Sequence, residues 1–338
     1  RRARRPRRQR CSVFLAWCAL PTAAVSLQDK AGRPQYPFFE LPTGDILNMN
    51  KYKNLPKNPV WPRCPFYEKC GEECIGSNFN HGKQLAPETK LLLESMDPKT
   101  TVVWGFGVPD DASVDIGLAC TYNFTSYSFD PSPEAVVHMD YLNKVVGKKE
   151  NIHPWTAPNH AGCNECDTYW EDVTHSMVPA DRINFYQRAI GEQDGGRITL
   201  YESPQEVMMP SPFSGSRVDG GRKMEVPAVT LQSLMTEMNT TKVDIIRIDV
   251  EGWETKILNQ VADLPQDQLP RLVFAALFEY SAFTCREFDA AVCKKMKSEA
   301  ITVIRKMRAR GYKAALYHHH DFIFMMGPPE VPSETNPM

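Results

Sequence analysis

Two acidic side chains follow one of the most apolar segments of the chain. The segment VDIIRI, residues 243–248, is followed by Asp249, Glu251 and Gly252. In open α/β folds, ligands bind at the ends of the buried strands, so a carboxylate placed there can take a proton from a bound substrate. Asp249 and Glu251 are therefore candidate catalytic residues. Their alternative role is to stabilise the start of the following helix.

A second group of residues is suited to binding a nucleoside. Gly105 and Gly107 end an apolar run that starts at Thr101, and Asp130 ends the next apolar run. Glycines let the backbone approach a ligand closely, and a carboxylate accepts hydrogen bonds from ribose hydroxyls. The pattern predicts an adenosine-containing cofactor, either NAD or S-adenosylmethionine. Its alternative is a tight turn between a strand and a helix.

The acidic residues after the glycines distinguish the two cofactors. Asp110 and Asp111 stand where a pyrophosphate would meet the start of the next helix, and a third glycine is missing. Acids at this place repel the phosphates of NAD but tolerate the sulfonium cation of S-adenosylmethionine. We therefore expect S-adenosylmethionine, with an NAD-dependent oxidoreductase as the alternative.

The elements that must position these residues alternate between strand and helix. Such alternation predicts an α/β fold with a mostly parallel sheet and helices on both faces. The last two strands are separated by only four residues, which requires an antiparallel hairpin. The predicted strands are 101–105, 124–129, 183–190, 197–202, 243–248, 271–280, 312–317 and 322–326, and the predicted helices are 88–96, 111–121, one from 132, 230–238, 253–261 and 286–310.

A long segment, 147–180, interrupts this alternation and is predicted to lie over the sheet. It contains His160, Cys163, Cys166 and His175, whose types and spacing suit either zinc or disulfides. Disulfides are the preferred interpretation, and no metal is assigned to the site. The aromatic residues of this segment either line an acceptor pocket or anchor the segment to the sheet. They are Trp155, Tyr169 and Trp170.

Five blocks of the sequence, in order, resemble the FkbM-type S-adenosylmethionine-dependent methyltransferases. The block around Asp249 is similar to the family signature KIDVEG-x-E, and the block that contains Asp130 is similar to aFEPxP. The resemblance spans roughly residues 97–327 and is closest to the eukaryotic methyltransferase-like branch of the family. The blocks are 127–133, 188–195, 229–234, 242–254 and 321–324.

The resemblance implies a Rossmann-like class I methyltransferase sheet with S-adenosylmethionine as cofactor. It places the glycines in the cofactor loop, Asp130 at the ribose and residues 189–191 around the adenine. The family pattern DxGAN is altered here, so its acid is expected to be displaced onto Asp110, Asp111 or Asp115. The residues assigned to cofactor binding are Gly105, Gly107, Asp110, Asp111, Asp130, Ala189, Ile190 and Gly191.

The resemblance also implies O-methylation, and together with the secretory compartment expected below it predicts methyl transfer to a hydroxyl of a glycan or small-molecule acceptor. The protein must align the acceptor and remove its proton, so Asp249 is expected to be the general base. Glu251 is expected to be a second polar contact or its substitute. Because the first acid of the family is displaced, a catalytically silent binding protein with the same fold is a further alternative.

Composition and charge limit the kinds of partner that the protein is expected to bind. The chain has 338 residues, 42% of them hydrophobic, which is enough for a buried core and excludes disorder throughout. The formal net charge is −2, but the first ten residues contain seven arginines, so the remainder has 32 basic against 41 acidic residues. A negative body repels a phosphate backbone, and nucleic acid is therefore not expected as a partner.

The N-terminal segment has the order of a secretory signal. Arginines are followed by the apolar run 11–20 and then by small residues. We expect a signal peptide or signal anchor over 1–27, which is the only segment expected to contact a membrane. A loop-rich stem or lid with cysteines follows over 28–84, and a methyltransferase domain over 85–338, with the insertion at about 147–180.

The remaining sequence fits an oxidising compartment. Eight cysteines lie beyond residue 27, an even number that suits disulfides, and Asn123 and Asn239 begin glycosylation sequons. The expected location is the lumen of the secretory pathway or the outside of the cell. The sequence does not predict an oligomeric state.

Overall fold

The structure is a computed structural model that describes eight segments of the chain. They are residues 74–75, 83–85, 87–109, 111–147, 166–201, 223–277, 290–317 and 321–327. All of them belong to one compact unit, Phe39–Met338. The expected signal segment 1–27 and nearly all of the expected stem 28–84 lie outside the described residues, as do Trp155, His160 and Cys163.

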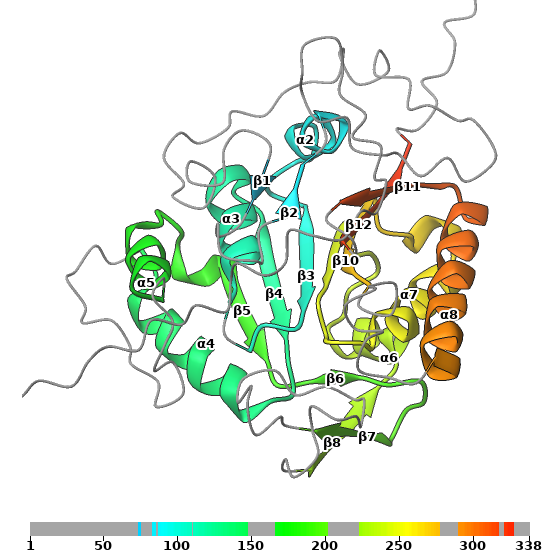
Figure 1. Cartoon of the computed structure of the whole chain (residues 1–338). Coiled ribbons are helices and arrows are strands. Elements are labelled where there is room, and N and C mark those ends of the chain that lie inside the picture. Colours follow the sequence, from blue (N-terminus) through cyan, green and yellow to red (C-terminus); the bar gives the residue numbers. More distant parts are fainter. Residues whose placement is uncertain are drawn as a thin grey trace, which may run out of the picture. The chain divides into compact units, whose positions relative to one another are not determined.

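A seven-stranded sheet forms the centre of the described part (Figure 1). Its order is β11-β12-β10-β9-β3-β4-β5. The pairs that β12 makes with β10 and β11 are antiparallel, and the other neighbouring strands of this sheet pair in parallel. The mostly parallel sheet and the antiparallel C-terminal hairpin are thus confirmed. The strands are β3 (Val102–Phe106), β4 (Thr125–Phe129), β5 (Ile183–Tyr186), β9 (Ile245–Ile248), β10 (Leu272–Ala276), β11 (Tyr312–Tyr317) and β12 (Asp321–Met326).

The strand order reverses at β3. The chain passes from β3 to β4 and β5 on one side and then returns to β9 and β10 on the other. In register, Gly105 of β3 lies between Ser128 of β4 and Arg247 of β9. Ligands of doubly wound sheets bind at such a reversal, outside the carboxyl ends of the strands. The ends of β3, β4 and β9 are therefore where a site is expected.

Helices cover both faces of the sheet because strand residues alternate between them. On one face, Val103 and Ile245 pack with Val114 and Leu118 of α3. The helices are α2 (Pro87–Glu94), α3 (Ser113–Tyr122), α4 (Pro133–Val145), α5 (Cys166–His175), α6 (Leu231–Glu237), α7 (Glu254–Asp263) and α8 (Ala290–Ala309), with the short 3-10 helices η2 (Ala180–Arg182) and η3 (Gln266–Gln268). β1 (Cys74–Ile75) and β2 (Lys83–Gln84) form a separate two-stranded antiparallel ribbon.

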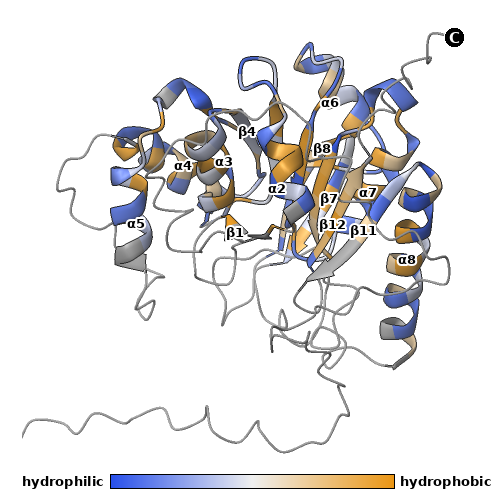
Figure 2. Ribbon diagram, turned by 90° about the horizontal axis from the view of Figure 1, so that it is seen from above, coloured by the Kyte–Doolittle hydropathy of each residue, from blue (hydrophilic) through white to orange (hydrophobic). Residues whose placement is uncertain are grey.

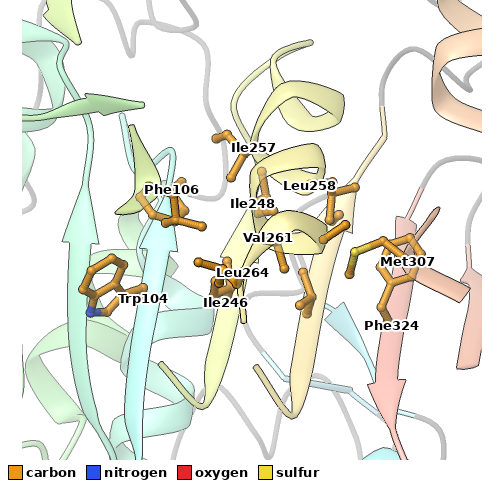
Figure 3. Close-up of a cluster of buried hydrophobic side chains, with 14 of the residues drawn as sticks. Trp104, Phe106, Ile246, Ile248, Ile257, Leu258, Val261, Leu264, Met307 and Phe324 are labelled. Carbon is orange, nitrogen blue, oxygen red and sulfur yellow. The ribbon is translucent and has the colours of Figure 1, made fainter. Parts of the chain in front are cut away.

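The opposite face holds the larger core. There, Trp104 and Ile246 of the sheet pack with Leu258 of α7 and Met307 of α8 (Figure 3). Figure 2 shows bands of both hydrophilic and hydrophobic residues along α8, as expected of a helix with one buried side. No helix in the part of the chain that the structure describes is long and apolar enough to cross a membrane.

Two helices begin where the sequence indicates. The Ser132 side chain accepts a hydrogen bond from the Ala135 N–H, with Pro133 as the first helical residue of α4. The Thr230 side chain likewise accepts from the Ser233 N–H at the start of α6. Such caps satisfy backbone donors that have no partner within the helix. Both predicted starts are confirmed.

A second, three-stranded sheet was not predicted. It consists of β6 (Ala189–Ile190), β8 (Lys223–Val229) and β7 (Gly196–Tyr201), in that order. It lies beyond the carboxyl ends of β4 and β5 (Figure 1). The expected strand 183–190 is therefore wrong as one element, because β5 ends at Tyr186 and β6 joins the second sheet. Pro227 within β8 weakens its strand signal.

The core on the α7 side allows a test of stability. Leu258 is fully buried between α7 and the sheet, whereas Val137 on α4 is 51% exposed. We expect Leu258→Ala to lower the free energy of unfolding by about 2–5 kcal/mol, because it removes buried contacts and leaves a cavity. Val137→Ala is the matched control and should change it by less than about 0.5 kcal/mol. Denaturant unfolding measures both, and equal effects would contradict this packing.

Candidate active site

A pocket lies where β3, β4 and β9 end, between the large sheet and the second sheet. The empty space within it is about 600 Å³, which includes solvent at its open mouth. Its walls are largely apolar, with a few polar side chains among them. The lining residues are Phe106, Gly107, Pro109, Phe129, Asp130, Pro131, Arg188, Ala189, Ile190, Ile198, Leu200, Asp249, Val250, Glu251, Trp253 and Ile257.

At the floor of the pocket, the backbone after β3 is in close contact with the backbone after β9. Gly107 has φ +88°, and a Cβ built on it would overlap the carbonyl oxygen of Asp249. Its N–H donates to the Phe129 carbonyl at 3.0 Å, while the Asp249 N–H donates to the Phe106 carbonyl at 2.9 Å. Only glycine fits this position, because any side chain would force the end of β3 away from Asp249.

Asp130 lines the pocket with its carboxylate already engaged. Its Oδ1 accepts hydrogen bonds from the N–H and the hydroxyl of Ser132, at 2.8 and 2.6 Å, and its Oδ2 accepts from the Val108 N–H at 2.9 Å. Each carboxylate oxygen has two acceptor positions, so Oδ2 keeps one for a ligand. Burial raises the pKa of the Asp130 carboxyl, and these hydrogen bonds together with the charge of Arg247 oppose that rise.

Asp249 is held by a buried cation. Its Oδ2 lies 3.2 Å from Nη2 of Arg247, whose side chain is only 3% exposed. The chain then turns through Glu251, which has φ +53°. The Glu254 Oε1 accepts from the N–H groups of Val250 and Gly252, at 2.9 and 3.0 Å. Glu254 therefore fixes the turn that carries Glu251, and both predicted catalytic carboxylates lie at the pocket.

The loop after β3 is supported from outside by a buried histidine. His138 Nδ1 lies 3.2 Å from the Val108 carbonyl, and its Nε2 lies 2.9 Å from the Tyr169 hydroxyl, which accepts from the Ala112 N–H at 3.1 Å. Since a carbonyl only accepts, Nδ1 carries the proton and the tyrosine donates to Nε2. This places Tyr169 and Trp170 in the anchoring role, because Trp170 packs against His138 and Tyr141.

The residues expected around the adenine divide into two groups. Ala189 and Ile190 line the pocket, and the Ile190 carbonyl accepts from the indole Nε1 of Trp253 at 2.8 Å. Gly191 does not line it. A Cβ on Gly191 would lie 2.7 Å from the Ala228 Cβ, so glycine there permits close packing of β6 on β8.

Two other expected cofactor residues, Gly105 and Asp111, do not line the pocket. Gly105 lies inside β3, where a Cβ would overlap the Asp115 carboxylate, so it belongs to the sheet and not to the loop. Asp111 is buried and its Oδ1 accepts from the Ser113 N–H at 2.6 Å, which fixes the start of α3. Asp110 lies outside the described residues.

The described residues contain no group of three or more histidine, cysteine, aspartate or glutamate side chains that could hold a metal ion. Of the residues considered for zinc, His160 and Cys163 are not described, and Cys166 begins α5. His175 Nδ1 lies 2.8 Å from the Glu171 carbonyl on the same helix.

Comparison with known proteins identifies the family. The model of the methyltransferase FkbM domain matches residues 107–314, more than half of the 338 residues. The chain belongs to the FkbM methyltransferase family. The matched region begins at Gly107, one residue beyond β3.

The FkbM methyltransferase also has distant likenesses among solved structures. A candidate caffeoyl-CoA O-methyltransferase from Staphylococcus aureus is 10% identical, with a TM-score of 0.34 over 68% of this chain and 78% of that chain. A protein from Corynebacterium glutamicum is 9% identical, with a TM-score of 0.38 over 71% and 79%. Precorrin-6y C5,15-methyltransferase from Geobacter metallireducens is 11% identical, with 0.34 over 79% and 100%. No curated protein matches the chain.

Members of this family use S-adenosylmethionine, and the pocket suits that cofactor. Gly107 gives the backbone access that an adenosine needs, and Asp130 Oδ2 offers an acceptor for a ribose hydroxyl. Apolar side chains such as Ile190 and Phe129 offer surface for the adenine ring. S-Adenosylmethionine is the cofactor of this FkbM methyltransferase.

Sequence reasoning missed much of the pocket wall. The missed residues come from β7, from the chain around β6 and from the start of α7. In the expected strand 197–202, Ile198 and Leu200 alternate with polar residues, and this alternation is the sequence signal that could have placed both on one buried side of β7. The missed lining residues include Arg188, Ile198, Leu200 and Trp253.

Two glycines test the close meeting of backbones in the FkbM methyltransferase. Gly107 and Gly195 both have positive φ, at +88° and +70°, but only at Gly107 would a Cβ meet other atoms. An alanine at either position would be held at positive φ, which costs about 1 kcal/mol of backbone strain in both variants. We expect Gly107→Ala also to weaken binding of S-adenosylhomocysteine by at least about tenfold, because the loop must shift. Calorimetry measures both, and equal affinities in the two variants would contradict this role.

Proposed function

We propose that this FkbM methyltransferase transfers a methyl group from S-adenosylmethionine to a hydroxyl of a glycan or other small polyol-like acceptor. One observation carries the proposal. A single pocket brings together Gly107, Asp130 and the carboxylates of Asp249 and Glu251. The first two suit the nucleoside of the cofactor, and the last two suit an acceptor that must lose a proton.

The bound cofactor supplies a methyl group activated by its sulfonium. The chain's own residues must orient the acceptor and take up its proton as the new C–O bond forms. In the proposal, Asp249 receives that proton. Arg247 holds Asp249 Oδ2 at 3.2 Å, which restricts the carboxylate to few orientations. Glu251 provides a second polar contact at the same edge of the pocket.

The charge at the pocket favours an uncharged acceptor. Three carboxylates line it, whereas the lining cation Arg188 is already paired with Glu237 at 2.7 Å. A carboxylate or phosphate on the acceptor would be repelled in this largely apolar space. A sugar or polyol hydroxyl carries no such charge. These features support a hydroxyl acceptor and favour Asp249 as its base.

We further propose that the protein works in the lumen of the secretory pathway or outside the cell. The basic and apolar N-terminal order supports this, with a retained anchor as the alternative to cleavage. Cys120 of α3 is disulfide-bonded, which suits an oxidising compartment. Of the two sequon asparagines, Asn239 is exposed after α6, whereas Asn123 is partly buried at the end of α3.

Cofactor binding tests the first half of the proposal. We expect the wild-type protein to bind S-adenosylhomocysteine, and Asp130→Ala to lose most of that affinity. The variant removes both the acceptor for the ribose and the partner of the Val108 N–H. Calorimetry at several temperatures measures the affinity. Asp172→Asn, which removes a buried carboxylate of α5, is the control. If Asp130→Ala binds as tightly as the wild type, Asp130 is not part of the site.

Methyl transfer tests the second half. Asp249→Asn keeps the size of the side chain but removes the base. We expect it to bind S-adenosylhomocysteine with little change and to transfer labelled methyl groups about 10²- to 10⁴-fold more slowly to a panel of glycans and polyols. Unchanged turnover would remove Asp249 from the role of base. Turnover only with carboxylate or amine acceptors would instead overturn the choice of a hydroxyl.

A further inference from the structure

A buried arginine lies beneath the pocket. Arg247 is the third residue of β9 and only 3% exposed, and it faces Gly105 across the parallel ladder. Gly105 in turn pairs with Ser128 of β4. Neighbours in register project from the same face of a sheet, so Gly105 leaves an empty side-chain place between Ser128 and Arg247.

Asp115 of α3 fills that empty place. A Cβ built on Gly105 would overlap Asp115 Oδ1, which shows that the helix carboxylate occupies the space a strand side chain would take. Asp115 Oδ1 also accepts hydrogen bonds from the hydroxyls of Ser126 and Ser128, at 2.8 and 3.2 Å. The side chain is 1% exposed. The carboxylate is therefore built into the sheet from the helix side.

Arg247 connects three parts of the site. Its Nη1 donates to the carbonyl of Gly107, its Nη2 lies 3.2 Å from Asp249 Oδ2, and its Nη1 lies 3.8 Å from Asp115 Oδ2. Burial raises the pKa of the Asp115 carboxyl, while Arg247 and the two serine hydroxyls oppose the rise. A buried cation needs a nearby anion, and Asp115 supplies one without lining the pocket.

We propose that Asp115 and Arg247 are positioning residues that couple the cofactor loop to the catalytic carboxylate. Asp115 neutralises and orients the guanidinium, which holds the Gly107 carbonyl with one arm and Asp249 with the other. The Arg247 guanidinium thus fixes the positions of residues 107 and 249 relative to each other. This inference rests on the proposed function, because it assigns Asp249 to the reaction.

Moving the carboxylate from the helix to the strand tests the proposal. Asp115→Asn keeps the size of the side chain but removes its charge, and it should weaken binding of S-adenosylhomocysteine by about tenfold. The double variant Gly105→Asp with Asp115→Ala returns a carboxylate to the same place from β3. It should recover the affinity to within about threefold of the wild type. Gly105→Asp alone should lose affinity, because two carboxylates would then compete for one space.

The charge of the cofactor separates positioning from a general loss of structure. S-Adenosylmethionine is a cation and S-adenosylhomocysteine is neutral. Asp115→Asn leaves Arg247 less compensated, so its affinity for the cation should fall by a further factor of about three. Glu88→Gln, which removes another buried carboxylate, is the control and should leave both affinities unchanged.

Arg247→Lys is a second, independent variant. Lysine keeps the charge, but one ammonium group cannot replace the two arms that reach Gly107 and Asp249. It should weaken cofactor binding by about tenfold while the unfolding temperature without ligand stays near that of Glu88→Gln.

Three results would overturn the inference: wild-type affinity in Asp115→Asn, wild-type affinity in Arg247→Lys, or equal loss for both cofactor forms together with a lower unfolding temperature. A folded double variant that does not recover affinity would also overturn it. If the wild-type protein itself binds neither cofactor form, the proposed function fails, and this inference fails with it.

Discussion

The site depends on how closely two backbones can approach. The turn after β3 and the turn after β9 touch through Gly107 and the carbonyl of Asp249, and the Asp249 N–H closes a hydrogen bond to the end of β3. This contact exists only because residue 107 has no side chain. It sets the distance between the region suited to the nucleoside and the carboxylate proposed as base. Other contacts around the pocket hold these two turns in place.

Support comes from both sides of the sheet. On the side of α3, His138 of α4 and Tyr169 of α5 hold the loop after β3 through the Val108 carbonyl and the Ala112 N–H. On the other side, the Trp253 indole ties the start of α7 to β6, and Gln260 Nε2 donates to the Gly191 carbonyl at 2.9 Å. The second sheet is therefore fixed to α7, the helix that follows the turn carrying Asp249 and Glu251.

Local signals in the sequence predicted the large sheet well. Apolar runs located its strands, and the hydroxyls of Ser132 and Thr230 marked helix starts, because each of these depends on neighbours a few residues away. The second sheet was missed because β8 contains Pro227, which weakens its strand signal, and because the two-residue strand β6 is too short to leave a pattern of its own.

The sequence likewise predicted some residues of the candidate site and misplaced others. Gly107, Asp130, Asp249 and Glu251 follow strands directly, so strand ends alone brought them to the pocket. Gly105 was expected in the cofactor loop, but it lies inside β3 and leaves room for the Asp115 carboxylate. In a sequence, a glycine that makes room for a helix side chain looks the same as a glycine that makes room for a ligand. Only the three-dimensional packing of α3 on β3 separates these two causes.

The hydrogen bonds of Asp130 have one more consequence. Its carboxylate is oriented by Ser132 and by the Val108 N–H in the protein alone. A ribose bound as proposed would meet a carboxylate whose rotation is already restricted, so ordering this side chain would cost little further entropy on association.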